Sequence, residues 1–445
     1  MSAKKVLIAN RGEIACRIIR TCREKGLRTV AVYSEADQDM PFVKMADESV
    51  CIGPPPVPKS YLDMESILKA ASKTKADMIH PGYGFLSENA GFAEKVQKKG
   101  LTWIGSDPSV ISKMGDKVVA RQTMQKAEIP VIPGSDGLNR LEDAVNVAKE
   151  MGYPVLVKAS AGGGGIGMQA CFNEEELKKH FQSLRNRAKA YFGNEGLFIE
   201  KVIPRARHIE VQIVADQHGN VIHLFERECS VQRRNQKVIE EGLSPSIHET
   251  TREKLRAAAV QAAKAARFSG VGTVEFLVDE SEQFYFLEMN TRLQVEHPVT
   301  EAITGIDFVD WQIRLAEGNP LPLKQEEVSC RGHAMEFRIY AEDPKRFLPS
   351  PGKVTKLSFP DGEGIRVDAG IREGNTVSPF YDPMIAKLIV SGCSREETLQ
   401  KASAALAQCK VEGIKTNLPL LKEVIESEPF QRGKYHTKLI NEILK

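Results

Sequence analysis

Two glutamates and an asparagine lie in a stretch whose predicted structure would bring them onto one face. Residues 273–279 and 284–290 are both typical of strands, and the four polar residues between them suit a hairpin loop. In that register Glu275 lies directly opposite Glu288, and Asn290 shares their face because side chains alternate along a strand. Opposed like charges repel, which favours a cation between them. Carboxylate and amide oxygens suit Mg²⁺, which takes its remaining ligands from phosphates.

The same register predicts the rest of the hairpin. It pairs Asp279 with Phe284 beside the loop. The face turned away from the glutamates would join the hydrophobic core, and it carries Val274, Phe276, Val278, Leu287 and Met289. Taken alone, the acidic face is better explained as the solvated surface of an exposed hairpin. The dense polar run that follows reverses this preference, since it holds Arg292, Gln294 and Glu296.

A glycine-rich run at 160–168 (SAGGGGIGM) suggests a phosphate contact. Its cost in backbone entropy is explained if backbone amides must approach a phosphate closely. No Gly-Lys-Ser/Thr closes the run, so it is not a Walker A loop, and it joins two predicted strands. We expect a flexible hairpin that closes over a nucleotide, with Lys158 of the preceding strand as a charge on the phosphates. The alternative is a disordered loop without function.

The composition is that of a soluble globular protein. The 445 residues allow two to four domains, and a net charge of +2 predicts no nucleic-acid partner. The eight cysteines form neither a CxxC motif nor a zinc spacing with histidine, which predicts reduced thiols in the cytoplasm. No apolar run approaches the length of a membrane span. The first predicted strand begins at Lys5, which leaves no room for a signal peptide.

The elements that must position these residues begin with a βαβ pattern. Predicted strands at 5–10 and 29–34 flank a helix at 11–26, which is typical of a doubly wound parallel sheet. The first turn lacks the GxGxxG motif, so no nicotinamide site is predicted. Residues 51–58 are expected to form a surface loop. The strand at 76–80 ends in HPGYG, which is either a plain turn or a ligand loop at the carboxyl end of a strand.

The rest of the chain alternates between predicted helices and strands. Helices are expected at 87–99, 113–127, 141–151, 251–268, 395–408 and 418–427, and strands at 155–159, 198–201, 207–215 and 222–226. The strand at 207–215 carries His208, Glu210 and Gln212 on one face. The polar run at 230–241 is typical of a solvated surface, or else it lines an anion site.

The last third of the chain opens with an alternating strand. Beyond residue 332 this alternation turns Met335, Phe337 and Ile339 toward the core. It places Glu336, Arg338 and Tyr340 on the opposite face.

Five motifs in order resemble the biotin carboxylase family, the ATP-grasp subunit of acetyl-CoA carboxylase and its relatives. They are IANRGEIA at 8–15, HPGYG at 80–84, MGDK at 114–117, the glycine run, and EMNTRLQVEH at 288–297. The resemblance covers essentially the whole chain. It implies an α/β architecture with an N-terminal Rossmann-like domain (1–115), an ATP-grasp domain (116–330) with a lid at about 134–204, and a C-terminal mixed α/β domain (331–445).

The family resemblance also implies a set of ligands. ATP, bicarbonate and two sites for Mg²⁺ or Mn²⁺ would serve the carboxylation of biotin on a carrier protein. The metals would lie on Glu275, Glu288 and Asn290. Around ATP the resemblance places Lys117, Lys158, Gly164, Gly165, Glu200, Lys201, Val202, Ile203, His208, Gln232 and Asn235. Around bicarbonate and biotin it places Tyr83, Lys237, Arg292, Gln294, Val295 and Arg338.

Catalytic roles follow from the same resemblance. Glu296 would be the general base that activates bicarbonate for attack on the γ-phosphate, with Arg292 and Lys237 beside it. The carboxyphosphate so formed would release CO₂, and Arg338 would stabilise the ureido oxygen of biotin. The chain departs from the family at Ile166 with Gln169, where many relatives carry a basic residue after the glycines. It also has Asn235 where histidine is common, which puts a nucleotide contact there in doubt.

The resemblance further implies partners. The family is commonly dimeric, and Arg20 and Glu24 match interface positions. No Met-Lys-Met triplet is present, so the carrier and the carboxyltransferase are expected on separate chains. The expected function is the first half-reaction of acetyl-CoA carboxylase in fatty acid synthesis. The acyl acceptor binds another subunit, so pyruvate, propionyl-CoA and methylcrotonyl-CoA carboxylation remain open.

Two alternatives lie outside this family. Another ATP-grasp ligase, with an amine attacking an acyl phosphate, would use the same hairpin and glycine run. The combination of residues 292–296 with Arg338 argues against it. A non-catalytic nucleotide-binding regulator would be expected to lack a metal carboxylate or Glu296, and neither is lost.

Overall fold

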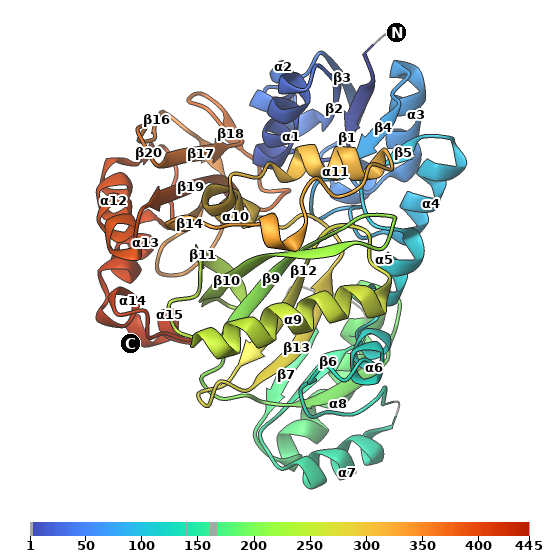
Figure 1. The fold of residues 1–445 in the computed structure, drawn as a ribbon, viewed down its shortest axis with the longest axis vertical. Helices are drawn as coiled ribbons and strands as arrows, with labels where there is room; N and C mark the ends of the chain where they lie inside the picture. The colour runs from blue at the N-terminus through green and yellow to red at the C-terminus, as the bar shows by residue number, and fades with distance from the viewer. Residues whose placement is uncertain (1–2, 139, 161–166, 445) are drawn as a thin grey trace.

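The computed structural model describes residues 3–138, 140–160 and 167–444 (Figure 1). The N-terminal part is a parallel sheet in the order β3-β2-β1-β4-β5, with helices packed on it. This confirms the predicted doubly wound start. Its elements are β1 (Lys5–Ile8), α1 (Gly12–Glu24), β2 (Arg28–Ser34), α2 (Pro41–Met45), β3 (Glu48–Gly53), α3 (Met64–Thr74), β4 (Met78–His80), α4 (Ala90–Lys98) and β5 (Thr102–Trp103).

Two predictions in this region need correction. Cys51 is not in a surface loop, because it pairs with Tyr33 at the end of β3. The single helix expected at 113–127 is two helices, α5 (Pro108–Gly115) and α6 (Lys117–Lys126). Asp116 interrupts them in an extended conformation, and its side chain accepts hydrogen bonds from the first free amides of α6. Lys117 therefore begins a helix instead of lying within one.

A separate small lobe holds the glycine run. Its sheet has the order β7-β6-β8, formed by β6 (Val155–Ala159), β7 (Met168–Cys171) and β8 (Leu197–Lys201). The helices α7 (Leu141–Met151) and α8 (Glu174–Phe192) pack on it at the end of the molecule opposite the N-terminal sheet (Figure 1). The predicted connection of strand to strand across the run is confirmed, since β6 and β7 pair antiparallel. Gly164, Gly165 and Ile166 lie outside the described residues.

The centre of the molecule is an eight-stranded sheet in the order β13-β12-β9-β10-β11-β14-β19-β17. Its pairings are antiparallel throughout. The strands are β9 (Arg207–Ala215), β10 (Val221–Arg233), β11 (Gln236–Gly242), β12 (Gly270–Val278), β13 (Phe284–Asn290), β14 (His333–Tyr340), β17 (Ile365–Ala369) and β19 (Met384–Gly392). The sheet crosses residue 330, so the second and third predicted domains share it.

Helices cover this sheet and complete the fold. The alanine-rich α9 (Glu249–Ala266) packs with its small side chains on Ile209, Val211 and Phe276 of the sheet (Figure 1). The remaining elements are α10 (His297–Thr304), α11 (Phe308–Ala316), β15 (Gly352–Lys353), β16 (Lys356–Ser358), β18 (Thr376–Val377), α12 (Arg395–Gln408), β20 (Lys410–Glu412), α13 (Leu418–Glu426), α14 (Glu428–Gln431) and α15 (Leu439–Ile443). Among the helices of the described residues, none is long and apolar enough to cross a membrane.

The polar run at 230–241 does not form a solvated surface. It makes up the end of β10 and most of β11, which form a hairpin. The turn lies at Arg234 and Asn235, both at positive φ (51° and 64°), a conformation that asparagine tolerates better than most residues. Most polar residues of these strands are buried because they face other charged groups within the sheet, whereas Gln236 beside the turn is exposed.

The β12–β13 hairpin confirms one pairing and corrects another. Glu275 pairs with Glu288, as predicted. Asp279 does not pair with Phe284, because Val278 takes that place and the register shifts by one residue between Glu275 and Phe276. The shift leaves Leu287 half-buried and turns Phe286 into the core instead. The prediction that Leu287 is a core residue is therefore wrong.

Candidate active site

A row of charged side chains crosses the central sheet. Glu288, Glu275 and Glu210 occupy neighbouring ladder positions on β13, β12 and β9, and Arg227 of β10 pairs with Glu210. Glu275 is 3% exposed and Glu210 is fully buried. Sequence reasoning assigned no role to Glu210. Its alternation with His208 along β9 is the signal that could have found it.

Lys237 of β11 joins three of the carboxylates at one point. Its Nζ atom donates to Glu210 at 2.5 Å, to Glu275 at 2.9 Å and to Glu296 at 2.6 Å. Burial disfavours the ammonium group, but the three carboxylates outweigh that cost and raise the pKa of Lys237 well above its usual value. The lysine is therefore a fixed positive charge at the centre of the cluster.

Glu296 lies directly before α10, between two cations. One carboxylate oxygen accepts from Lys237, and the other accepts from Arg338 of β14 at 2.9 Å. The side chain is only 2% exposed. Burial alone would raise the pKa of Glu296, but Lys237, Arg338 and Arg227 outweigh it and hold that pKa below its ordinary range. Glu296 is an ionised carboxylate at neutral pH.

Arg227 supports this cluster from within the sheet, and sequence reasoning missed it. The fully buried guanidinium donates to Glu210 at 2.5 Å, to Gln212 at 2.7 Å and to Gln294 at 3.1 Å. Gln294 in turn donates to Glu275 at 2.7 Å. The side-chain oxygen and nitrogen of Gln294 are thus both hydrogen-bonded, which holds this predicted bicarbonate residue in place. Local sequence could not distinguish Arg227 from a solvent-facing arginine on a strand.

Glu275 and Glu288 have the donor chemistry of a divalent-metal site. Lys117 lies 2.8 Å from Glu288 and lowers its pKa. For Glu275, burial would raise the pKa, but Lys237 and His208 outweigh it and hold the pKa well below its usual value. Both groups are therefore ionised at neutral pH, and paired carboxylate oxygens suit Mg²⁺ or Mn²⁺. The ammonium groups of Lys117 and Lys237 and the imidazole of His208 surround them in this arrangement.

Asn290 and Arg292 complete the predicted segment. The amide nitrogen of Asn290 donates to Glu275 at 2.9 Å, and its oxygen accepts from Arg292 at 2.9 Å. Asn290 therefore lies at the predicted place, while its oxygen faces an arginine. Arg292 also binds Glu88 at 2.8 Å. Glu88 precedes α4, so the N-terminal sheet contributes to the site through a residue that sequence reasoning did not identify.

The predicted nucleotide residues fall into two groups. Lys117 lies in the central cluster, and its backbone amide donates to the carbonyl of Ser160, where the glycine run begins. His208 and Gln232 contact each other at 2.7 Å beside Glu275. These contacts bring four elements together around one space: α6, β9, β10 and the start of the lid.

The second group lies in the lobe or at its edge. Lys158 of β6 binds Glu200 of β8 at 2.5 Å, and both are nearly buried. The structure does not bring the remaining candidates into the central cluster. Lys201 is exposed and donates to the carbonyl of Met151, and Asn235 is exposed at the β10–β11 turn. Val202 and Ile203 follow β8 and are half-buried. Gly164 and Gly165 lie outside the described residues.

Tyr83 and Val295 are tied to each other through two buried charges. The hydroxyl of Tyr83 donates to Glu13 of α1. Lys387 of β19 is fully buried, donates to the carbonyl of Val295 at 2.7 Å and lies 3.3 Å from Glu13. The N-terminal and C-terminal parts of the chain thus meet at the loop that carries the predicted bicarbonate residues.

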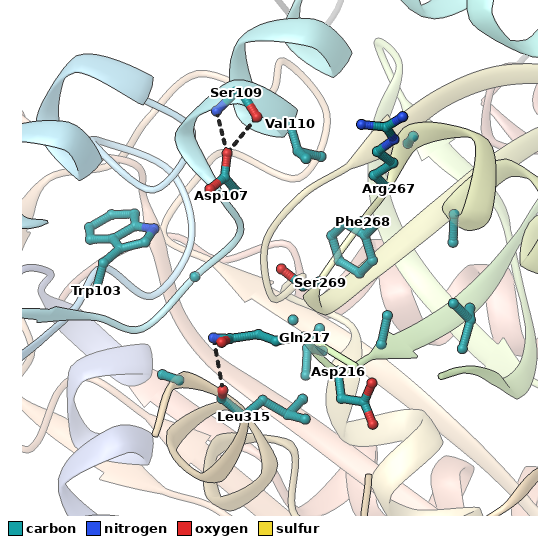
Figure 2. A pocket seen from close by; sticks show the side chains of 18 of the residues that line it. Trp103, Asp107, Ser109, Val110, Asp216, Gln217, Arg267, Phe268, Ser269 and Leu315 are labelled. Atoms are coloured by element: carbon teal, nitrogen blue, oxygen red, sulfur yellow. Dashed lines mark hydrogen bonds between the residues drawn. The ribbon is translucent and has the colours of Figure 1, made fainter. Parts of the chain in front are cut away.

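A cavity of about 1160 Å³ lies elsewhere, between β5, the C-terminal end of α9 and the β9–β10 turn (Figure 2). None of the predicted site residues lines it. Two of its polar side chains have local partners: Asp107 accepts from the amide and hydroxyl of Ser109, and Gln217 donates to the carbonyl of Leu315 (Figure 2). Convergent chemistry is found in the charged cluster, which is therefore the candidate active site.

Family models match almost the whole chain. The biotin carboxylase N-terminal domain matches residues 2–111, and the biotin carboxylase C-terminal domain matches residues 336–442. Between them, the ATP-binding domain of the carbamoyl-phosphate synthase L chain matches residues 116–324.

Curated proteins and solved structures agree with these matches. A biotin carboxylase of Halalkalibacterium halodurans is 56% identical over 99% of this chain and 98% of its own. One of the pyruvate carboxylase subunits of Methanothermobacter thermautotrophicus is 49% identical over 98% of this chain and 89% of its own. The Campylobacter jejuni biotin carboxylase–β-γ-ATP complex superposes with a TM-score of 0.97 at 46% identity, covering 99% of this chain and 98% of its own.

A second solved structure describes ligands and a dimer. It is the biotin carboxylase domain dimer of Hydrogenobacter thermophilus 2-oxoglutarate carboxylase, in complex with MgADP, ADP and bicarbonate. Its TM-score is 0.96 at 47% identity, covering 99% of this chain and 98% of its own. Fold and site define an ATP-grasp enzyme, as the sequence predicted. More narrowly, the chain belongs to the biotin carboxylase family of biotin-dependent carboxylases.

Proposed function

We propose that this chain carboxylates biotin on a separate carrier protein, using ATP and bicarbonate, as the first half-reaction of an acetyl-CoA carboxylase. One observation carries the proposal. Lys237 binds the candidate base Glu296 and the candidate metal ligand Glu275 at the same time. A base that shares a cation with a metal carboxylate is suited to deprotonating bicarbonate as it attacks a phosphate.

Nucleotide binding is assigned to the space between the lobe and the central sheet. Lys117 and Lys158 would pair with phosphate oxygens, while His208 and Gln232 would contact the nucleotide beside them. Glu275 and Glu288 would hold Mg²⁺ or Mn²⁺, which supplies positive charge to the phosphates when bound. Support comes from the carboxylates' ionised state and from the MgADP bound in the Hydrogenobacter thermophilus domain. The glycine-rich lid would exclude water from the reacting groups.

Bicarbonate is assigned to the far side of Lys237. Arg292 and Gln294 would bind its oxygens, with the backbone of Val295 beside them. Glu296 then takes its proton as the bicarbonate oxygen attacks the γ-phosphate, which gives carboxyphosphate and ADP. Lys237 and Arg338 leave Glu296 ionised before the reaction begins. A bicarbonate complex of a related domain is also known in the Hydrogenobacter thermophilus enzyme.

Biotin is assigned to Arg338 and Tyr83. Carboxyphosphate would split into CO₂ and phosphate, and the phosphate would take the proton of the ureido nitrogen. The Arg338 guanidinium would leave Glu296 and stabilise the ureido oxygen as its charge develops, while the nitrogen bonds to the carbon of CO₂. Replacement of Arg338 by alanine is expected to spare bicarbonate-dependent ATP hydrolysis and to remove the carboxylation of free biotin. Labelled bicarbonate and an ADP assay measure the two reactions side by side. Equal loss of both would contradict the assignment.

The assembly and the acceptor are further proposals. We infer a homodimer, supported by the dimer of the related 2-oxoglutarate carboxylase domain and by the charged surface of α1 that carries Arg20 and Glu24. Separate carrier and carboxyltransferase chains would complete the enzyme. The eight free cysteines support a cytoplasmic location. A pyruvate or 2-oxo acid acceptor is the second candidate, since the compared proteins include such enzymes. A pull-down from the native source identifies the carboxyltransferase and so decides the acceptor.

A further inference from the structure

Two buried glutamates next to the site have no role in the reaction above. Glu240 of β11 and Glu336 of β14 lie directly opposite each other in the sheet. Both are fully buried. Like charges in this arrangement repel, and burial removes the water that would otherwise screen them. The molecule must therefore neutralise at least part of this charge.

Their carboxylate oxygens have few partners. None of the four accepts an aligned hydrogen bond from a side chain or backbone group of the described residues. Glu240 lies 2.5 Å from the guanidinium of Arg338, which makes it an ion-pair partner. No ion pair of Glu336 is found within the described part of the chain. The two glutamates are thus unequal, because only Glu240 holds Arg338.

The cations near Glu336 already pair with other acceptors. Arg338 serves Glu296 as well as Glu240, and Lys387 serves Glu13 and the Val295 carbonyl. Lys237 serves three other carboxylates. Among residues 3–138, 140–160 and 167–444, no cation forms an ion pair with Glu336. Burial raises the pKa of Glu336, and the charge of Lys387 offsets this rise only in part.

Other neighbours do not supply one. The Cys229 thiol lies next to this cluster, and burial raises its pKa well above the usual value. On α10, which packs on both strands, burial holds the pKa of His297 well below its usual value, and Glu301 is taken by Arg17 and Arg366. The buried faces of α12 and α13 are uncharged.

We propose that Glu336 is a neutral carboxylic acid whose proton lets Glu240 ionise alone, and that this pair positions Arg338 for biotin. The proposal rests on the role of Arg338 given above. Glu240 keeps the guanidinium in place when Arg338 releases Glu296 to take the ureido oxygen. A second charge on Glu336 would hold Arg338 more tightly and oppose the negative oxygen of the substrate. Glu240 and Glu336 are positioning residues, since neither is assigned a contact with substrate.

Titration of the pair gives the proposal a measurable signature. Burial raises the pKa of Glu240 to about 7, although Arg338 opposes the shift, and it raises that of Glu336 well above its usual value. Below neutral pH, Glu240 therefore gains a proton and loses its hold on Arg338. The KM for biotin should rise as pH falls through this range, while bicarbonate-dependent ATP hydrolysis without biotin should not follow it.

Two variants and one control test the proposal in the full-length enzyme with free biotin. Glu240→Gln should raise the KM for biotin roughly tenfold, as expected for the loss of its ion pair with Arg338, and should abolish the pH dependence of that KM. Glu336→Gln should leave both unchanged, because glutamine resembles the protonated acid. Glu228→Gln, in a similarly buried glutamate that binds Ser244 and Ser246 instead, should also change neither.

Three results would overturn the proposal. A pH dependence displaced by about one unit or more in Glu336→Gln would show that Glu336 is ionised. An unchanged KM for biotin in Glu240→Gln would show that Glu240 does not position Arg338. If a variant does not fold, infrared spectra of the wild type near pH 8 decide instead, since the proposal requires the C=O band of a protonated carboxyl group and its absence refutes it. If the wild type shows no bicarbonate-dependent ATP hydrolysis, the proposed function is wrong. That result is distinct from the three above, which concern the role of Glu240 and Glu336.

Discussion

The cations around Glu296 reduce its strength as a base. Lys237 and Arg338, which with Arg227 keep it ionised, also make it a weak base, because they stabilise the carboxylate. In the proposed reaction, bicarbonate binds Lys237 and Arg292, and biotin binds Arg338. Both cations are then redirected to substrates, and Glu296 becomes more basic as the reactants assemble. Basicity that depends on bound substrates would also limit wasteful ATP hydrolysis.

Glu336 should make the protein less stable as pH rises. Its folded pKa is raised, whereas in the unfolded chain a glutamate ionises near about 4.3. Above that value the folded state binds more protons than the unfolded state, so stability is lost as pH rises toward the folded pKa. Glu336→Gln removes this loss. Relative to wild type, its free energy of unfolding should rise by about 1.4 kcal/mol for each pH unit above the unfolded pKa, up to the folded pKa.

Urea unfolding of wild type and Glu336→Gln at about pH 5.5 and 8 measures the effect. The gain in free energy of unfolding should be larger at the higher pH. A variant that is equally destabilised at both values would show that Glu336 is charged and paired in the folded state.

Asp116 fixes the start of α6 and with it the position of the site residue Lys117. Its side chain caps α6, and Lys117 is the first residue of that helix. Asp116→Ala should lower the free energy of unfolding by about 1 kcal/mol. It should also raise the KM for ATP, because the first turn of α6 no longer holds Lys117 in a fixed position. Asp63 caps α3 in the same way, far from the site in the sequence. Asp63→Ala should cost similar stability and leave the KM for ATP unchanged, and equal KM values in both variants would contradict the argument.

At the level of elements, local patterns predicted the strands and helices well where alternation or capping signals were strong. Leu141–Met151 and Val155–Ala159 are observed with the predicted bounds. The errors have physical causes. A bulge at Leu287 depends on partners that no local pattern reveals, and Asp116 divided a helix that hydrophobic periodicity alone made continuous. Apart from its exposed turn at Arg234, Asn235 and Gln236, the run at 230–241 is largely buried because charges from distant strands neutralise it.

The candidate site was partly predictable for the same reasons. The opposition of Glu275 and Glu288 was predicted from a hairpin register, but the predicted loop pairing is wrong and a bulge restores the opposition. The roles proposed for Arg292 and Arg338 came from motifs. Glu210, Arg227 and Glu88 became visible only when distant segments were brought together. Their importance lies in tertiary contacts, which sequence spacing does not encode.

At the level of the whole molecule, a charged cluster lies where α1, α10 and β17 meet. Glu301 of α10 binds Arg17 of α1 and Arg366 of β17, and it accepts from the backbone amide of Phe308. Arg17 and Glu301 are nearly buried. Removing the carboxylate charge would break both pairs. Loss of a buried pair typically costs about 3 to 5 kcal/mol, and the cost is moderated here because Arg17 keeps Asp307 and Arg366 keeps Asp368.

Glu301→Gln tests this junction. Urea unfolding should show a loss near the lower end of that range, since Arg366 is partly exposed. The matched control is Glu412→Gln, whose partner Lys356 is exposed and 3.6 Å away. That change should stay within about 0.5 kcal/mol of wild type. Similar midpoints for both variants would show that the junction contributes little.

The central claim is that Glu296 is the base that activates bicarbonate. The most direct measurement is bicarbonate-dependent ADP release by purified Glu296→Gln, alongside ATP binding by calorimetry. ADP release should fall at least about 100-fold, and the affinity for ATP should be unchanged. Near-normal ADP release from a variant that folds and binds ATP would contradict it.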